Sequence, residues 1–394
     1  MIQIKPRIEH QGTCPGCGQE INPFRVLWQG QHTCGVFKCP SCQTLFLEDF
    51  RMMFSIDAPF QVNLLTGDLI QLYGKTDYVG WFGRPLRQSL ASPQDYPNLA
   101  IKVEKIKDHQ EVVILNCLDF LYGHCLIKLL DLEYYLNQQT SLGIIIIIPD
   151  ILRWLVPDSV AEIWTVNIPL GKMLNFYPEL DQRINRECER FDLVYVSKGV
   201  HQPPFCNITR YTRAPQYNFE KQDFRITFIW RSDRVWSPQK VYLYHGISPE
   251  IRLYSLEQQQ KNICQLFEQL RIHFPHAIFT VAGLGRETAF PCWIDDCRVE
   301  KYTEDLERSM CQIYGESHLV IGVHGSNMLL PSAHAGLTID LLPDDRWGNL
   351  ADDIIYQDIP INKIVHKYIH LPLAIDIHLL TKIAAVVIDK LCKK

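Results

Sequence analysis

Residues 318–343, HLVIGVHGSNMLLPSAHAGLTIDLLP, contain the pattern around which the rest of the chain is interpreted. An apolar run over 319–323 reaches a short polar turn, an apolar segment with helical spacing follows over 327–335, and a second apolar run covers 338–342. This order predicts a strand, a turn, a helix and a strand. Because such units build parallel sheets covered by helices, the stretch predicts an α/β domain.

The turn itself carries residues that suit a ligand site: His324, Gly325, Ser326 and Asn327. Glycine allows the chain to bend sharply where a strand stops, and we expect Ser326 to cap the following helix. Free amides at a helix start receive phosphate or sugar oxygens at the carboxyl edge of a parallel sheet. Turns of this kind also occur without ligands. His324 favours a site, because we expect its imidazole to point into the crevice and donate to an anionic oxygen.

The composition indicates a globular chain of two or three domains. It has 394 residues, of which 47% are hydrophobic and 21% charged, and its formal net charge is -5. This charge gives no electrostatic basis for a nucleic-acid partner. The densest apolar run, 143–149, is too short to span a bilayer, and the N-terminus lacks the profile of a signal peptide. We expect a cytoplasmic protein, with peripheral docking at the inner membrane face by an amphipathic tail over 371–391 as the alternative.

Two C-x2-C pairs predict a zinc ribbon near the N-terminus. The pairs are formed by Cys14, Cys17, Cys39 and Cys42. Four thiolates complete a tetrahedral zinc site and leave no open position for catalysis, so we expect a structural metal. Cys34 and His32 are close enough in sequence to act as substitute ligands, and a redox or disulfide pair is the alternative. The ribbon then either stabilises the fold or docks a protein partner.

The patterns after the ribbon divide the chain further. Short apolar runs between turn residues predict small strands over 51–110. In the first α/β series we expect strands at 112–115, 144–148 and 192–196, and helices at 118–137 and 172–190. In the second we expect strands at 224–230 and 277–282, and helices at 255–274 and 303–315. The predicted segments are a ribbon at 1–50, α/β domains at 51–215 and 216–350, and a helical tail at 351–394 that packs back on the first domain.

Two further constellations carry possible chemistry. Arg231, Asp233 and Arg234 follow the strand at 224–230. Two arginines there can clamp a diphosphate while Asp233 orients them, although a surface salt-bridge cluster gives the same pattern. His124 lies beside Gly123 within the helix expected at 118–137. A glycine in a helix suggests close approach of a ligand or of backbone, whereas a single helical histidine is commonly a packed core residue.

Taken in order, four segments resemble glycosyltransferase family 61, which includes plant xylan-decorating transferases and secretory O-GlcNAc transferases. The segments are LYGHCLIKLLDLEYYL, IIIIPD, FIWRSDRVW and LVIGVHGSNMLLPSAHAGLTIDLLP. The family shows a helix with a "gH…D" pattern, an arginine-rich segment after a strand of the second domain, and a "HGAGLTN" turn followed by "viEl". This chain has HGSNM in the turn and Asp340 in place of the glutamate. The zinc ribbon is not a feature of that family.

The resemblance implies a GT-B type fold: two Rossmann-like domains, here preceded by the ribbon, with the acceptor on the first domain and the nucleotide-sugar on the second. It also implies inversion at the anomeric carbon without a catalytic metal, and the sequence has no Asp-x-Asp of the kind that holds a divalent ion. Carried over by residue, Arg231 and Arg234 hold the diphosphate and residues 324–327 line the donor pocket. His124 is then a candidate base, with Asp131 as its orienter or as the alternative base.

The expected function is therefore transfer of a sugar from a nucleotide-sugar to a glycan, a lipid-linked glycan or a protein. One alternative is a non-catalytic adaptor, in which the ribbon docks a partner and the α/β body has lost its donor site. A second is another nucleotide-dependent enzyme such as a dehydrogenase, but no G-x-G-x-x-G follows an early strand. Binding of a nucleoside diphosphate distinguishes the transferase from the adaptor.

Overall fold

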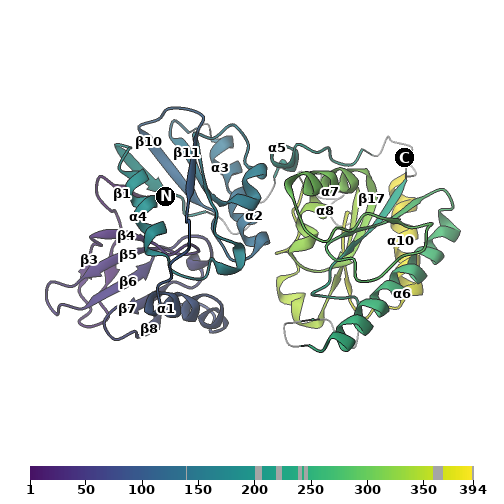
Figure 1. Cartoon of the computed structure of the whole chain (residues 1–394), viewed down its shortest axis with the longest axis horizontal. Coiled ribbons are helices and arrows are strands. Elements are labelled where there is room, and N and C mark those ends of the chain that lie inside the picture. Colours follow the sequence, from purple (N-terminus) through teal and green to yellow (C-terminus); the bar gives the residue numbers. More distant parts are fainter. Residues whose placement is uncertain are drawn as a thin grey trace. The chain divides into compact units, whose positions relative to one another are not determined.

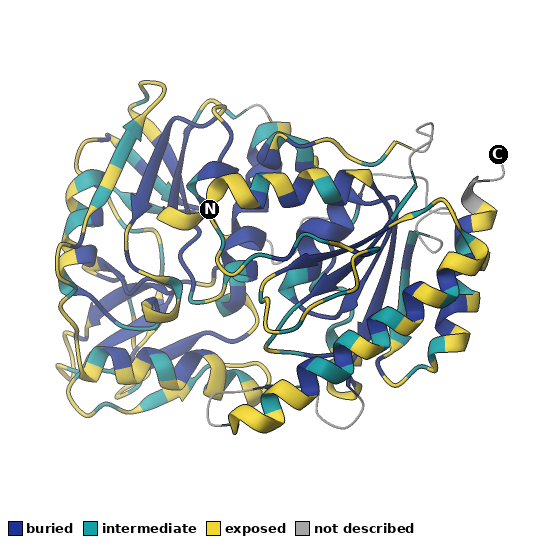
Figure 2. Ribbon diagram, turned by 45° about the vertical axis from the view of Figure 1, so that its right-hand side comes forward, coloured by how far each residue is buried: buried dark blue, intermediate teal, exposed yellow. Residues whose placement is uncertain are grey.

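The fold is given by a computed structural model that describes residues 1–138, 140–199, 206–218, 224–237, 242–243, 247–357 and 367–392 (Figure 1). The chain forms two compact units, Met1–Pro203 and Pro204–Lys394. Each is built around a sheet whose strands are mostly buried (Figure 2). The expectation of a mixed α/β fold is confirmed.

The first unit contains a six-stranded sheet in the order β1-β13-β10-β11-β12-β9. Its strands are β1 (Ile2–Lys5), β9 (Ile101–Lys105), β10 (Glu111–Asn116), β11 (Gly143–Pro149), β12 (Glu162–Val166) and β13 (Leu193–Val196). The four central strands are parallel, and β1 and β9 pair antiparallel at the edges. All residues of β11 are buried, as expected for a strand covered on both faces.

The helices of this sheet differ from the sequence expectation in their bounds. They are α2 (Tyr122–Leu130), α3 (Leu132–Asn137) and α4 (Pro178–Cys188). The helix expected at 118–137 is thus two helices that meet at Asp131. Because α2 begins only at Tyr122, Gly123 lies in its first turn and not within a helix interior. The argument that a glycine within a helix indicates close approach of a ligand or of backbone therefore does not apply at Gly123.

The N-terminal part of the first unit is a five-stranded antiparallel sheet in chain order: β4 (Arg25–Trp28), β5 (Thr33–Lys38), β6 (Leu45–Asp49), β7 (Phe60–Asn63) and β8 (Leu69–Gln71). Strands β2 (Gly12–Thr13) and β3 (Glu20–Ile21) form a hairpin, and α1 (Arg84–Ala91) follows the sheet. The sheet runs on past the boundary that the sequence suggested at residue 50. Trp28 is fully buried, and its backbone N–H donates to Asp181 Oδ1 of α4 at 2.9 Å. This segment thus shares its packing with the α/β part of the unit.

The second unit contains a parallel six-stranded sheet in the order β16-β15-β14-β17-β18-β19. Its strands are β14 (Arg225–Trp230), β15 (Ile278–Gly283), β16 (Asp295–Asp296), β17 (Ser317–Val323), β18 (Leu337–Leu342) and β19 (Tyr368–Pro372). Its helices are α5 (Ile208–Thr212), α6 (Pro249–His273), α7 (Glu304–Glu316), α8 (Leu329–His334) and α10 (Ile377–Cys392). The strand–turn–helix–strand pattern predicted for 318–343 is confirmed.

Helix α10 packs on the second unit. Its buried residues Leu380, Ala384 and Ile388 belong to the same core as the buried face of α6, and Thr381 Oγ1 donates to Gln269 Oε1 of α6 at 3.0 Å. Figure 1 shows α6 and α10 side by side. The expectation that the tail packs back on the first domain is therefore not met, because its apolar face is buried against α6. None of the described helices is long and apolar enough to cross a bilayer.

Candidate functional site

The candidate site of the second unit lies where β14 and β17 end. These neighbouring parallel strands pair Ile229 with Gly322, so that the residues after Trp230 and Val323 emerge at the same edge of the sheet. Strands β15 and β16 lie on one side of β14, whereas β17, β18 and β19 follow on its other side. The direction in which successive strands are added therefore reverses between β14 and β17. In open α/β sheets, ligands bind at the carboxyl edge beside such a reversal. Arg231 and His324 are the first residues beyond the two strands.

Gly325 provides room for two arginines. Its φ of +148° is rarely adopted by residues with a Cβ, and a Cβ built there would clash with Nη1 of Arg231 and lie 2.7 Å from Nη1 of Arg234. Both guanidinium groups therefore approach the backbone of the turn directly. Arg231 and Arg234, which the resemblance grouped with the turn at 324–327, lie about ninety residues from Gly325 in the chain but beside it in the fold.

Arg231 is held by two partners. Its Nε and Nη2 donate to the two carboxylate oxygens of Asp233 at 2.7 and 2.6 Å, a contact that both an orienting aspartate and a surface salt bridge predict. Its Nη1 donates to Asn327 Oδ1 at 2.7 Å, which links the ends of β14 and β17. The Nδ2 of Asn327 is buried and makes no hydrogen bond within the described residues. Asn327 thus keeps an amide donor for a ligand.

Arg234 is a half-buried cation without a carboxylate partner among the described residues. Its Nη1 donates to the backbone carbonyl of His324, its guanidinium lies 5.2 Å from the ring centroid of Tyr242, and its Nε is buried without a hydrogen bond. Burial lowers the pKa of Arg234, and the charges of Arg231 and Arg346 lower it further. Tyr242 and Asp353 act in the opposite direction on this pKa. Three arginines thus lie close together at this edge of the sheet, which favours binding of an anion.

Arg346 is the third cation of this cluster, and the sequence analysis missed it. It lies in the 3₁₀ helix Asp344–Asn349 that follows β18. Its Nε donates to the Tyr242 hydroxyl at 3.1 Å, and its guanidinium lies 5.8 Å from the same ring. Asp345 lies 3.6 Å from the Nε of Arg346 and accepts from the Tyr242 hydroxyl at 2.7 Å. The available signal was its position four residues beyond the end of the strand predicted at 338–342. Arg231, Arg234 and Arg346 are called the arginine cluster below.

His324 has a different role from the expected one. Its ring is fully buried, with Nδ1 2.6 Å from Asp340 Oδ2 and Nε2 3.3 Å from Asp353 Oδ2. His370 Nδ1 also lies 3.2 Å from Asp340 Oδ2. The expectation that the imidazole of His324 points into an open crevice is therefore wrong. The ring anchors the turn between two carboxylates, and the backbone carbonyl of His324 contacts the arginine cluster through Arg234.

The helix after the turn is shorter than predicted. A 3₁₀ turn at Ser326–Met328 precedes α8. The N-cap of this turn is Gly325, and neither the turn nor α8 has a side-chain cap hydrogen bond. The prediction that Ser326 caps a helix over 327–335 is thus wrong. Because α8 has only six residues, the start of this helix contributes little to an anion site. The arginine cluster carries that role instead.

In the first unit, His124 belongs to a network of charged residues that the sequence only partly indicated. His124 Nδ1 lies 3.1 Å from Asp119 Oδ1, and Lys128 Nζ lies 3.0 Å from Asp119 Oδ2. Asp119 and Lys128 are almost completely buried, while a quarter of the His124 side chain is exposed. Asp131, the other predicted candidate, is buried where α2 meets α3. Asp119 was missed because the helix predicted at 118–137 included it, and residues five apart in a helix do not share a face. Because α2 begins only at Tyr122, Asp119 precedes the helix and can contact His124.

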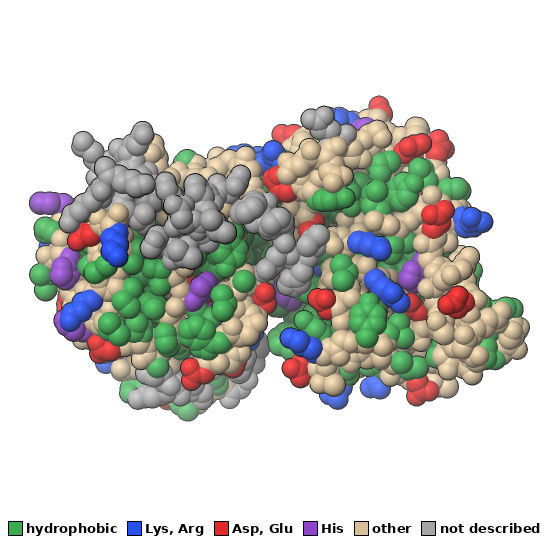
Figure 3. Space-filling model, turned by 180° about the vertical axis from the view of Figure 1, so that it is seen from behind, with side chains coloured by type: hydrophobic (Ala, Val, Ile, Leu, Met, Phe, Trp, Pro, Cys, Tyr) green, Lys and Arg blue, Asp and Glu red, His purple; other side chains and the backbone are tan. Residues whose placement is uncertain are grey.

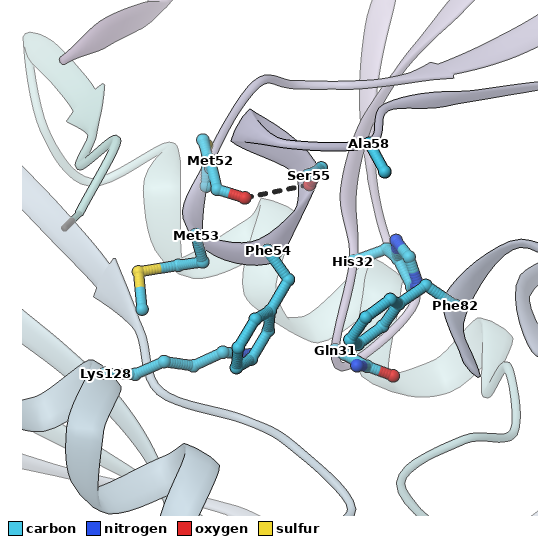
Figure 4. Close-up of a pocket in the computed structure, with 9 residues that line it drawn as sticks. All are labelled: Gln31, His32, Met52, Met53, Phe54, Ser55, Ala58, Phe82 and Lys128. Carbon is cyan, nitrogen blue, oxygen red and sulfur yellow. Dashed lines mark hydrogen bonds between the residues drawn. The ribbon is translucent and has the colours of Figure 1, made fainter. Parts of the chain in front are cut away.

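A small cavity lies beside Lys128 (Figure 4). Its volume of about 10 Å³ matches the room needed by roughly one water molecule. The side-chain amide of Gln31 and Nε2 of His32 are buried without hydrogen bonds in this part of the described chain, and both residues line the cavity. Phe54 forms another part of the wall, and Lys128 Nζ lies 5.7 Å from the centroid of its ring.

The four predicted metal ligands come together. The Sγ atoms of Cys14, Cys17, Cys39 and Cys42 all lie within 4.8 Å of one another. Cys14 and Cys42 are 3.4 Å apart, and Cys17 and Cys39 are 3.5 Å apart. Sulfur atoms bound tetrahedrally at about 2.3 Å from zinc are roughly 3.8 Å apart, so the spacing fits a metal site. The Cys34 and His32 alternative is not part of this cluster, because both contact Asp49 instead.

Comparison of the chain with models of protein families, with curated proteins and with solved structures gives no match.

Proposed function

We propose that this chain is an inverting glycosyltransferase that needs no catalytic metal and uses a nucleotide-sugar donor. The observation that carries the proposal is the arginine cluster at the carboxyl edge of the second sheet, where Arg234 is half-buried without a carboxylate partner in the described chain. A nucleoside diphosphate supplies the negative charge that this site lacks. The resemblance to glycosyltransferase family 61 supports the same assignment through Arg231, Arg234 and the turn at 324–327.

The strand order of the second sheet supports a nucleotide-binding fold. Numbered from β14 to β19, it corresponds to the order 3-2-1-4-5-6 of dinucleotide-binding domains. We therefore propose that the second unit is Rossmann-like and binds the donor. We propose the same class for the first unit, whose four central strands are parallel, and assign it the acceptor.

The chemistry requires two functions from the protein. A base must take the proton of the acceptor hydroxyl, and positive charge must stabilise the departing diphosphate. The guanidinium groups of Arg231 and Arg234 offer directed donors for phosphate oxygens, and the Asn327 amide adds a neutral donor. Arg346 adds positive charge beside Tyr242. His124 is the base in this proposal, because Asp131 is buried.

We assign zinc to the cysteine cluster. Its four thiols leave no position for a substrate, so this metal would stabilise the fold of the first unit. The acceptor would be a glycan, a lipid-linked glycan or a protein. On the face drawn in Figure 3, basic side chains are scattered among acidic ones, which gives no support to a nucleic-acid partner.

A thermal-shift screen tests the proposal. Purified chain is heated with UDP, GDP, CMP and their sugar conjugates, and with inorganic pyrophosphate as a control for charge alone. A ligand that binds only the folded protein must raise the melting temperature. We expect one nucleoside diphosphate to stabilise the protein more than pyrophosphate at the same concentration. No stabilisation by any of these ligands would contradict the proposal and favour the adaptor alternative.

A further inference from the structure

We propose that Asp119 and Lys128 are positioning residues that hold His124 in the orientation and tautomer of a general base. The three residues lie in the first unit, on and just before α2, and Asp119 was not predicted as part of a site. This inference rests on the proposed transferase function and identifies which carboxylate supports the base. In this inference Asp119, and not Asp131, supports the base.

The contact between Asp119 and His124 determines the tautomer. A carboxylate accepts hydrogen bonds and does not donate them, so the Nδ1 of His124 must carry the proton that Asp119 Oδ1 receives at 3.1 Å. The other nitrogen, Nε2, then carries the lone pair. Nε2 makes no hydrogen bond within the described residues, and a quarter of the His124 side chain is exposed. The arrangement therefore presents an acceptor nitrogen at the surface of the unit, where a hydroxyl can reach it.

Lys128 keeps Asp119 available as an acceptor. Burial raises the pKa of the Asp119 carboxyl, but the charge of Lys128 and the contact with His124 outweigh burial and lower it to about 2. Lys128 is itself nearly completely buried and also donates to the backbone carbonyl of Leu118 at 2.7 Å. Its ammonium group is therefore fixed beside Asp119. A buried charged pair is not needed for stability, because well-packed apolar residues stabilise a core as well.

Aromatic rings fix the plane of the imidazole. The His124 ring lies 4.5 Å from the ring of Phe54 between centroids, and it meets Phe120 edge-on at 6.0 Å. Asp119 Oδ1 also accepts from the backbone N–H of Leu121 at 3.2 Å, which ties the carboxylate to the start of α2. Asp119 and His124 are thus both held in place before any substrate binds, as efficient proton transfer requires.

In the proposed reaction, His124 accepts the proton of the acceptor hydroxyl. Its Nε2 takes this proton while the hydroxyl oxygen forms a bond to the anomeric carbon of the donor. The bond between the anomeric carbon and the diphosphate oxygen breaks, and its electron pair leaves with the diphosphate. The imidazolium formed at His124 is stabilised by ionised Asp119, which remains paired with Lys128.

The tautomer can be tested without substrate. Long-range ¹H–¹⁵N NMR correlations on histidine-labelled full-length chain distinguish Nδ1–H from Nε2–H imidazoles, and loss of a signal in His124→Gln assigns His124. We expect the Nδ1–H tautomer in the wild type, a loss of that preference in Asp119→Asn, and no change in Asp108→Asn, a control at an exposed aspartate of the same unit. An Nε2–H tautomer in the wild type, or an unchanged signal in Asp119→Asn, would overturn the inference.

An activity assay separates this inference from the proposed function. Release of UDP from UDP-glucose or of GDP from GDP-mannose is measured with water as the acceptor. We expect His124→Gln to lower kcat by roughly 10² to 10⁴ and Asp119→Asn by about 10 to 10², with the KM for the donor unchanged in both. Wild-type protein that binds no nucleoside diphosphate overturns the proposed function and the base role with it. Binding and turnover that Asp119→Asn leaves intact overturn the inference alone.

Discussion

Arg231 Nη1 donates a hydrogen bond to Asn327 Oδ1 at 2.7 Å, although 96 residues separate them in the chain. Each residue follows a central strand of the second sheet, and the parallel pairing of β14 with β17 brings the two strand ends together. Arg231 is thereby aimed at the turn, and Arg234 reaches the same turn through the carbonyl of His324. The arginine cluster is therefore a consequence of strand order, and several predictions depend on it.

Removal of Arg234 should stabilise the protein when no ligand is present. This guanidinium is half-buried, is repelled by Arg231 and Arg346, and forms no ion pair in the described part of the chain. We expect Arg234→Met to raise the free energy of unfolding by about 0.5–1 kcal/mol, because the methionine keeps apolar contact and removes the repulsion. Urea unfolding without added anion measures this change. A loss of stability above about 1 kcal/mol would show that the hydrogen bond to His324 outweighs the repulsion.

Gly325→Ala should damage both the turn and the anion site. The added Cβ would clash with the guanidinium of Arg231, and the alanine would have to keep a φ near +148°. Such strain costs on the order of 1–3 kcal/mol of stability. The matched control is Gly348→Ala, since a Cβ at Gly348 meets no atom within 4 Å. Melting temperatures of the two variants check the prediction, and an equal effect would contradict it.

The cysteine cluster should contain about one zinc ion per chain, measured by elemental analysis of protein purified without chelator. Cys39→Ser should remove the metal and lower the stability of the whole first unit. This coupling is expected because Trp28, near the cluster in sequence, is buried against α4. The control is Cys292→Ser, at an exposed cysteine outside the cluster. Protein without zinc, or a Cys39→Ser variant as stable as this control, would contradict the account.

Acid should destabilise the second unit before it affects the first. Burial lowers the pKa of both His318 and His334 from 6.5 to about 4, whereas the unfolded chain keeps the ordinary value. Unfolding therefore takes up protons between pH 6.5 and 4, and stability is full above this range and falls as pH decreases through it. Each histidine contributes up to about 3 kcal/mol.

Urea unfolding at pH 7 and pH 4.5 measures this loss. We expect the loss to be smaller in His334→Gln, because one of the two buried groups no longer titrates. Asp119 does not contribute in this range, since its pKa is lowered to about 2 and its stabilisation is lost only at more acidic pH. Equal stability of the wild type at the two pH values would contradict the prediction.

The elements of the second unit were largely readable from the sequence. Strand β17, strand β18 and helix α7 match their predicted ranges closely, and Thr303 caps α7 by accepting from the Leu306 N–H at 3.4 Å. These elements have strong periodicity and clear boundaries. Strand β12 of the first unit was missed, and β9 falls within the range 51–110, where small strands were expected without individual bounds. They are short, and their place in the sheet is set by pairing with distant strands, which no local pattern reports.

The members of the site were predicted in part, but their contacts were not. The resemblance to glycosyltransferase family 61 grouped Arg231 and Arg234 with the turn at 324–327, and the two C-x2-C pairs predicted the cysteine cluster, whereas Arg346 was missed. Burial of His324 between Asp340 and Asp353 could not be foreseen. The contact with Asp353 depends on the path of the chain over the thirteen residues after Asp340. The apolar residues of that segment show no helical or strand periodicity that would predict this path. The direction of the His324 side chain is therefore set by tertiary contacts and not by the local sequence.

The most direct test of the central claim is isothermal titration of the full-length chain with UDP and with GDP. We expect the wild type to bind one of them, and Arg231→Ala and Arg234→Ala each to lose about 1.5–3 kcal/mol of binding free energy, the range for hydrogen bonds to charged groups. Arg308→Ala, which removes a half-buried arginine paired with Glu304 on α7, should bind like the wild type. Equal affinity in all four proteins, or no binding of either nucleotide by the wild type, would contradict the account.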